Sequence, residues 1–163
     1  MSIVVSDASP VRALQHLGHL DWLHELFDHV FLPPAVAAEL RRPPATYTSV
    51  DVSEWPHLEV RAPRNAARVT ELQVELDPGE AEAIALAEEL RADVVLIDEL
   101  AGRDVAIRSG LTVVGTLGVL LEAKRLGLCP AVKPLLDRLQ TELNFFVSTR
   151  LRRAILQQAG EHP

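Results

Sequence analysis

The chain has 163 residues, 48% of them hydrophobic but only 4% aromatic, which suits one domain with a core of aliphatic side chains. Its net charge of −7 is a poor balance for nonspecific nucleic-acid binding, although the 16 basic residues leave room for a local basic stripe. The single cysteine, Cys129, excludes an internal disulfide, and the sequence has neither a signal peptide nor a run of the ~20 apolar residues that span a bilayer. We therefore expect a cytoplasmic protein that has no contact with membranes.

Short apolar segments alternate with amphipathic ones in the first part of the chain. The elements predicted there are a strand at 2–6, helices at 9–17 and 20–27 separated by Gly18, and a strand at 29–32. Pro34 suits the first position of a further helix, AVAAELRR. Residues 43–65 contain four prolines and little periodicity, so we predict an irregular segment there with a weak strand at LEVRA.

The same alternation continues through the second part. The predicted elements are a helix near 65–74, a helix over 79–91, a strand at 94–97, a helix over 100–110, a strand at 111–115, a helix over 116–127, and one long or two short helices within 131–157. Asp77 is placed to cap the helix over 79–91, and Pro78 fits its first turn. Short apolar strands alternating with helices indicate an α/β protein with a parallel sheet covered on both faces.

Two of these strands run directly into carboxylates. Asp7 follows the first strand in IVVSDASP, and Asp98 follows a later strand in VVLIDEL. In open parallel sheets the ligand site lies beyond the carboxyl ends of the strands. Asp7 and Asp98 are therefore expected at the functional edge of the sheet.

Helices contribute further acids near their buried sides. In the helix over 79–91, Glu80 falls about 55° from the centre of the apolar face, whereas Glu82 falls roughly 100° away and is better placed for solvent. In AVAAELRR, Glu39 lies roughly 60° from the buried Val36.

Four acids thus lie on core-facing margins of separate elements: Asp7, Glu39, Glu80 and Asp98. Clustered carboxylates repel and raise one another's pKa values, and a divalent cation resolves this repulsion. Hard oxygen ligands suit Mg²⁺ or Mn²⁺. A metal site of this kind lowers the pKa of a bound water and holds a phosphate oxygen, as phosphodiester hydrolysis requires. Each acid taken singly also fits a helix cap, a surface charge or an Arg partner.

Five segments in order carry a family likeness: IVVSDASP, PPAVAAEL, LDPGEAEAIALAEEL, VVLIDELAGRDVA and GTLGVLLEAKRLG. Together they resemble the PIN-domain family over residues 2–140, and more narrowly its VapC-like bacterial and archaeal group. The resemblance implies a three-layer α/β/α fold with a mostly parallel central sheet, an acidic pocket that binds Mg²⁺ or Mn²⁺, and ribonuclease activity on single strands. It makes all of 1–163 one PIN-like domain in which 141–163 form a helical extension.

The resemblance also assigns residues. Asp7, Glu39, Glu80 and Asp98 correspond in that order to the four family acids, as metal ligands and catalytic groups. Ser9 matches a small polar residue lining the pocket, and Arg103 would contact the acids or a substrate phosphate. The strand runs directly into two acids here, so Asp98 or Glu99 can be the fourth ligand.

Other residues leave alternatives open. Thr116 begins a helix after Gly115, where the glycines permit either a tight turn or a phosphate contact. The histidines of QHLGHLDWLHELFDHV are more easily explained as helix-surface residues than as a zinc site. The basic run TRLRRA is either a solvated helix face or a contact for RNA or a partner. The leucine stripe from Leu14 to Leu26 is mostly core, and part of it can serve as a dimer face.

The acidic residues and this resemblance together predict a metal-dependent endoribonuclease that is the toxin of a type II toxin–antitoxin pair. Its expected partners are an RNA substrate, an antitoxin protein and a second copy in a homodimer. One alternative is a noncatalytic PIN-fold binding module whose acidic pocket receives a partner protein's Arg. Another is a hydrolase of small phosphoesters.

Overall fold

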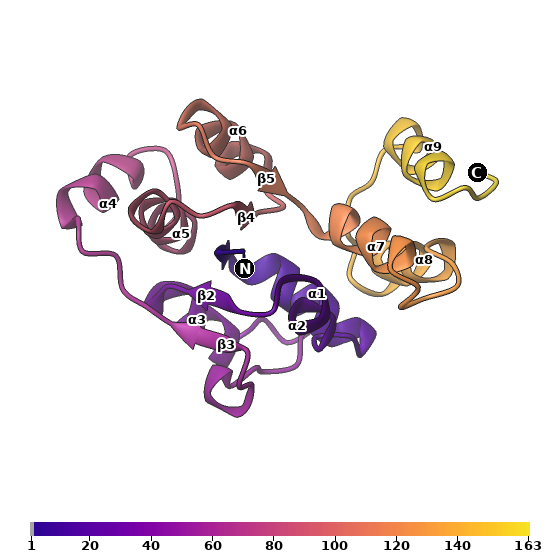
Figure 1. Cartoon of the computed structure of the whole chain (residues 1–163), viewed down its shortest axis with the longest axis horizontal. Coiled ribbons are helices and arrows are strands. Elements are labelled where there is room, and N and C mark those ends of the chain that lie inside the picture. Colours follow the sequence, from indigo (N-terminus) through magenta and orange to yellow (C-terminus); the bar gives the residue numbers. More distant parts are fainter. Residues whose placement is uncertain (1) are drawn as a thin grey trace.

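The computed structural model describes residues 2–163. Its centre is a five-stranded, all-parallel sheet with strand order β3-β2-β1-β4-β5 (Figure 1). The strands are β1 (Val4–Ser6), β2 (Val30–Leu32), β3 (Leu58–Val60), β4 (Val94–Leu96) and β5 (Val113–Val114). The α/β prediction with a mostly parallel central sheet is confirmed.

Helices connect the strands. Within residues 2–163 they are α1 (Ala8–Leu17), α2 (Trp22–Phe27), α3 (Pro34–Arg41), the 3-10 turn η1 (Val52–Glu54), α4 (Ala66–Leu72), α5 (Pro78–Leu90), α6 (Leu100–Arg108), α7 (Thr116–Arg125), α8 (Lys133–Glu142) and α9 (Thr149–Gln158). No helix in this part of the chain combines the length and the apolar character needed to cross a membrane.

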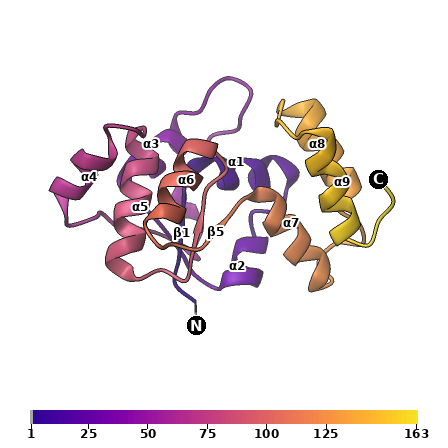
Figure 2. The same ribbon diagram turned by 90° about the horizontal axis from the view of Figure 1, so that it is seen from above.

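Each face of the sheet has its own hydrophobic core. Alternate strand residues point to opposite faces, so Val4 belongs to one core with residues of α1, α3, α7 and α8, whereas its neighbour Val5 belongs to another with residues of α5 and α6. Figures 1 and 2 show α4, α5 and α6 grouped on one side of the strands and α7, α8 and α9 on the other side of the molecule. The leucine stripe of α1 and α2 lies in the first core, with Leu14 and Leu23 fully buried, as predicted.

The starts of α3 and α5 and the end of α1 lie where local sequence features predict them. Pro34 and Pro78 each occupy the first turn of a helix, and Asp77 caps α5 by accepting a hydrogen bond from the Glu80 N–H at 2.8 Å. Gly18 ends α1 in the left-handed conformation, with a φ of 80°. The weak strand predicted at LEVRA is β3, at an edge of the sheet.

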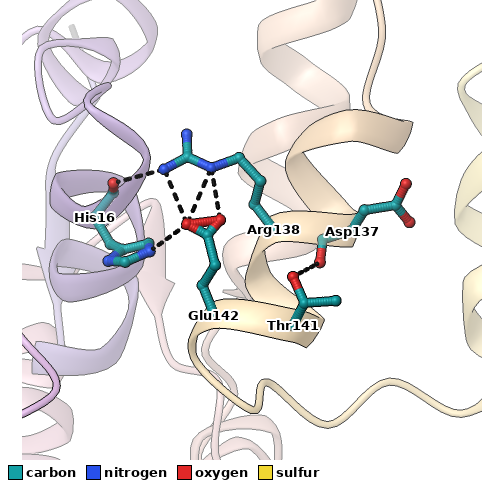
Figure 3. A network of polar contacts seen from close by, with 5 residues as sticks. All are labelled: His16, Asp137, Arg138, Thr141 and Glu142. Atoms are coloured by element: carbon teal, nitrogen blue, oxygen red, sulfur yellow. Dashed lines mark hydrogen bonds and ion pairs between the residues drawn. The ribbon is translucent and has the colours of Figure 1, made fainter.

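The C-terminal region forms two short helices rather than one long one. Asn144, with a φ of 52°, follows the end of α8, and the Ser148 side chain caps α9. A polar network links α8 to α1 (Figure 3): Arg138 pairs with Glu142 at 2.9 Å, and Glu142 also lies 3.2 Å from the His16 ring. The Arg138 guanidinium donates in addition to the His16 carbonyl.

Candidate functional site

Two predicted acids lie side by side at the carboxyl edge of the sheet. Asp7 directly follows β1, and Asp98 lies just beyond β4, the strand paired with β1. The backbone N–H of Asp7 donates to the Leu96 carbonyl at 2.9 Å, which continues the pairing past the last residue of β1. The arrangement follows from parallel strands of matched register, whose carboxyl ends meet at one edge.

Asp98 is held by three donors. Its carboxylate accepts hydrogen bonds from the Ser9 hydroxyl at 2.9 Å, the Thr116 hydroxyl at 2.6 Å and the Thr116 N–H at 2.7 Å. Thr116 is fully buried and begins α7, so Asp98 takes up the N–H that a phosphate at this helix start would need. This geometry favours the tight-turn interpretation of the glycine-containing segment.

Glu39 and Asp7 both reach the start of α5. A Cβ added at Gly79 would collide with the Glu39 Oε1 and lie 3.4 Å from the Asp7 Oδ1. Only a glycine at this position lets both carboxylates lie against the helix start. The carboxylates of β1 and α3 therefore meet at the first turn of α5.

Glu80 is directed from α5 toward α6. It is buried, and its Oε2 has no hydrogen-bond partner among the described residues. A Cβ at Gly102 would lie only 2.5 Å from this oxygen, so the glycine provides the space that the carboxylate occupies. Glu80 is therefore a buried acid with one unsatisfied oxygen.

Burial and mutual repulsion raise the pKa values of Asp7, Glu39 and Glu80. The pKa of Asp7 is raised to about 7, chiefly by burial and in addition by the charges of Asp77, Glu39 and Asp98, against a backbone hydrogen bond that lowers it. Asp7 is only 6% exposed, so its negative charge is costly without a compensating partner.

The pKa values of the other two acids shift in the same direction. Burial raises the pKa of Glu80 to about 8, helped by a hydrogen bond and repulsion from Asp77. The pKa of Glu39 is raised by burial and by Asp77, and lowered by the guanidinium of Arg12. The acids of four separate elements thus lie within electrostatic reach of one another.

Sequence reasoning missed two members of this cluster. The sequence predicts Asp77 only as a helix cap, yet it also raises the pKa values of Asp7, Glu39 and Glu80. Arg12 donates to the Glu39 carbonyl at 3.0 Å, and its guanidinium lies 5.4 Å from the centre of the Tyr47 ring. Arg12 follows Ser9 by three residues in α1, a spacing that places both on one helix face.

The solvent-facing position predicted for Glu82 is wrong. Glu82 is partly buried, and its Oε1 accepts a hydrogen bond from the Ala35 N–H at the start of α3, at 3.1 Å. Helix α3 packs against α5 and covers this side of it. The periodicity of α5 alone does not reveal that a second helix lies there.

The remaining predicted residues lie around Asp98. Arg103 donates from Nη1 to the carbonyl of Ile97 at 2.9 Å, and a Cβ at Gly115 would lie 2.9 Å from both this nitrogen and the Asp98 Oδ1. Glu99 is exposed and raises the pKa of Glu80 through its charge. Both Asp98 and Glu99 are therefore electrostatically coupled to the cluster.

The donor set fits a hard divalent cation. The oxygens are carboxylates, their charges are mutually repulsive, and the buried Glu80 Oε2 has an unused acceptor site. In residues 2–163 no three Asp, Glu, His or Cys side chains converge as a finished metal site. Asp7, Glu39, Glu80 and Asp98 are the residues that could hold such an ion.

Comparison with known proteins agrees with this arrangement. A family profile described as a PIN domain matches residues 3–161, almost the whole chain. The search of curated proteins finds no match. The all-parallel sheet with helices on both faces is consistent with this fold family. The chain belongs to the PIN-domain family.

Proposed function

We propose that this protein is a cytoplasmic, Mg²⁺- or Mn²⁺-dependent endoribonuclease, and the VapC-like toxin of a type II toxin–antitoxin pair. PIN domains are generally nucleases and typically use divalent metals, so family membership supports a hydrolase of phosphodiester bonds at the coarse level. The RNA substrate, the metal ions and the toxin role are the finer content of the proposal.

The observation that carries the proposal is the environment of Asp7. This carboxylate is 6% exposed at the carboxyl edge of the sheet, and Asp77, Glu39 and Asp98 all raise its pKa. A protein that only needed a stable fold would gain from an apolar residue here, because buried, repelling carboxylates are costly. A cation bound among them offsets this cost.

Each residue then has a role. Asp7, Glu39, Glu80 and Asp98 would hold the ion, while Ser9 and Thr116 fix the orientation of the Asp98 carboxylate. When bound, such an ion would supply positive charge that lowers the pKa of water and stabilises charge on the phosphate. Arg103 and Arg12 are the cationic side chains placed to contact phosphate, and a cluster carboxylate accepts the proton that the attacking water releases.

The test is cleavage of a panel of RNAs in Mn²⁺ or in EDTA by wild type, Asp7→Asn and Asp93→Asn. Asp93 is a matched control, because it accepts the Ile3 N–H at 2.7 Å at the opposite end of the sheet. We expect cleavage by wild type and Asp93→Asn in Mn²⁺, and none by Asp7→Asn or in EDTA. Cleavage that survives Asp7→Asn would contradict the assignment of this site.

The second candidate is a noncatalytic binding module in which a partner's Arg occupies the acidic cluster. The unsatisfied Glu80 Oε2 suits the guanidinium of a partner's Arg as well as a metal ion. Such a module would bind its partner in EDTA and cleave no RNA in any metal. A small-phosphoester hydrolase would turn over nucleotides and leave RNA chains intact.

The toxin role requires partners. We expect expression of the protein to arrest growth, co-expression of a cognate antitoxin to relieve the arrest, and the purified chain to run as a homodimer. Growth arrest by Asp7→Asn equal to that by wild type would contradict a toxin that acts through this site.

A further inference from the structure

A cavity of about 400 Å³ lies beside the acidic cluster. Helix α7, the segment before α9 and α9 itself supply most of its wall, and α7 and α9 pack together (Figure 1). The apolar side chains that line it include Leu117, Leu121, Phe145, Phe146, Leu151 and Ile155. Asp98 and Arg103 line the same cavity, so it is continuous with the candidate site.

Phe146 is the exceptional residue of this wall. Its side chain is 88% exposed, whereas its neighbour Phe145 packs against the hydrophobic core. Leu151, also in the lining, is 43% exposed. An exposed aromatic ring beside a cavity offers a stacking surface that the folded chain itself does not cover.

At its polar end the cavity carries a positively charged side chain, Arg103, in place of apolar ones. Arg103 uses Nη1 to bind the Ile97 carbonyl, and its guanidinium has further N–H groups that suit a phosphate. An aromatic ring together with a guanidinium is the combination that binds single-stranded nucleic acid through base stacking and phosphate contact.

We propose that this cavity is a nucleobase subsite. One unpaired base of an RNA strand stacks on Phe146, and Arg103 contacts an adjoining phosphate. Because Asp98 belongs to both the acidic cluster and the cavity wall, the bound base belongs to a nucleotide next to the scissile phosphate. The inference rests on the proposed ribonuclease function.

The size of the cavity agrees with a single base. Cavities of about 300–1,000 Å³ hold drug-sized ligands, so one of about 400 Å³ has room for a purine or a pyrimidine. Its apolar lining offers stacking without a dense set of hydrogen-bonding groups. The subsite is therefore expected to tolerate every base, since each has a π-face.

The experiment measures RNA binding without cleavage. Every protein carries Asp7→Asn, and binding of a fluorescently labelled single-stranded RNA is measured in Mg²⁺. The compared variants are Phe146→Ala, Phe146→Trp, Arg103→Gln and Val74→Ala. Val74 is a matched control because it is 85% exposed and lies outside the cavity. The same measurements are repeated with RNAs that carry one abasic nucleotide at successive positions.

We expect Phe146→Ala to weaken binding by roughly tenfold, with Phe146→Trp and Val74→Ala close to the parent protein. Arg103→Gln should weaken binding and reduce its dependence on salt. At one position, an abasic nucleotide should remove the difference in affinity between the Phe146→Ala variant and its parent, because the stacked base is then absent. That position should adjoin the cleaved bond mapped with wild-type protein.

Other outcomes overturn the inference. Equal RNA affinity of Phe146→Ala and its parent would exclude stacking on Phe146. An equal loss of affinity in Phe146→Ala with every abasic RNA would also exclude it, because it would indicate a general surface effect. Absence of RNA binding by the parent protein would exclude the subsite altogether. RNA binding with the expected pattern but no cleavage by wild type would retain the subsite and refute the nuclease.

Discussion

The Asp98 carboxylate accepts a hydrogen bond from the hydroxyl of Ser9, a residue 89 positions earlier in the chain, at 2.9 Å. This bond joins the first turn of α1 to the end of β4. Together with the two bonds from Thr116, it leaves Asp98 one defined orientation at the carboxyl edge of the sheet. Ser9 and Thr116 therefore act as positioning residues for a proposed metal ligand.

Removal of the Ser9 hydroxyl should weaken the site without unfolding the protein. Loss of a group that orients a metal ligand typically costs roughly 10–100-fold in metal affinity or activity, and Ser9→Ala is expected at the lower end because Thr116 remains. Calorimetric titration with Mn²⁺ and cleavage assays measure the two effects. Ser49→Ala is the matched control, because that hydroxyl bonds the Arg41 carbonyl in an exposed loop. Equal Mn²⁺ affinity in Ser9→Ala and Ser49→Ala would contradict the positioning role.

Gly102→Ala should displace the Glu80 carboxylate. The new methyl group would lie 2.5 Å from the Glu80 Oε2 and 3.0 Å from an Ile97 methyl, and the flexible end of Glu80 can move more easily than the core. We expect Tm to change little, because alanine favours the helix, while cleavage falls by at least roughly tenfold as Glu80 leaves the cluster. Thermal unfolding and cleavage rates are measured on the same sample, and unaltered cleavage by a folded Gly102→Ala protein would place Glu80 outside the active site.

The metal-free protein should lose stability as the pH rises from acid to neutral. Asp7 has a pKa of about 7 in the folded state against an ordinary value of 3.8, and burial is the largest cause. The folded state therefore keeps a proton that the unfolded chain releases, and the free energy of unfolding falls as the pH rises between these two values. The raised pKa of Glu80, about 8, extends the fall to higher pH.

Thermal unfolding in EDTA measures this effect. We expect Asp7→Asn to unfold at a Tm roughly 3–10 °C above wild type near pH 8, and at a similar Tm near pH 4, where both side chains are neutral. Mn²⁺ should raise the Tm of wild type near pH 8 and leave that of Asp7→Asn nearly unchanged. Glu75→Gln, at an exposed ion pair with Arg108, should follow the wild-type pH profile. A difference between wild type and Asp7→Asn that does not vary with pH would contradict the raised pKa.

The attachment of α8 should depend on its leucines more than on the polar network of Figure 3. Leu139 is fully buried in the first core, so Leu139→Ala is expected to cost about 2–5 kcal/mol of unfolding free energy. The Arg138–Glu142 pair is exposed to solvent, so Arg138→Ala should lower Tm by no more than about 2 °C. Urea unfolding measures the free energy of unfolding of both variants. A larger loss of unfolding free energy in Arg138→Ala than in Leu139→Ala would show that the polar network, not the leucines, attaches α8.

Much of the fold follows from local features of the sequence. Apolar runs too short for helices predict the strands, and Pro34, Asp77 and Gly18 mark helix ends because their preferences depend on neighbouring residues alone. Asp7 and Asp98 can be placed at one edge because parallel strands align their carboxyl ends. The open alternative between one and two C-terminal helices is a case where periodicity alone did not decide.

The cluster itself depends on contacts between elements far apart in the sequence. Glu82 illustrates this, since α3 covers the side of α5 that periodicity assigns to solvent. Asp77 likewise has the sequence of a helix cap, and only the packing of β1, α3 and α5 brings its charge near three other acids. The grouping of Phe146 with Arg103 also arises from the way α9 packs on α7.

The sequence by itself determined the order and approximate position of the strands and helices and which acids stand at strand ends, since these depend on spacing and backbone preference. Only the tertiary structure decided which carboxylates repel, which hydroxyls hold Asp98, and which glycines make room for Glu39 and Glu80. Distances, burial and charge repulsion are properties of packed elements, and a linear spacing of residues does not contain them.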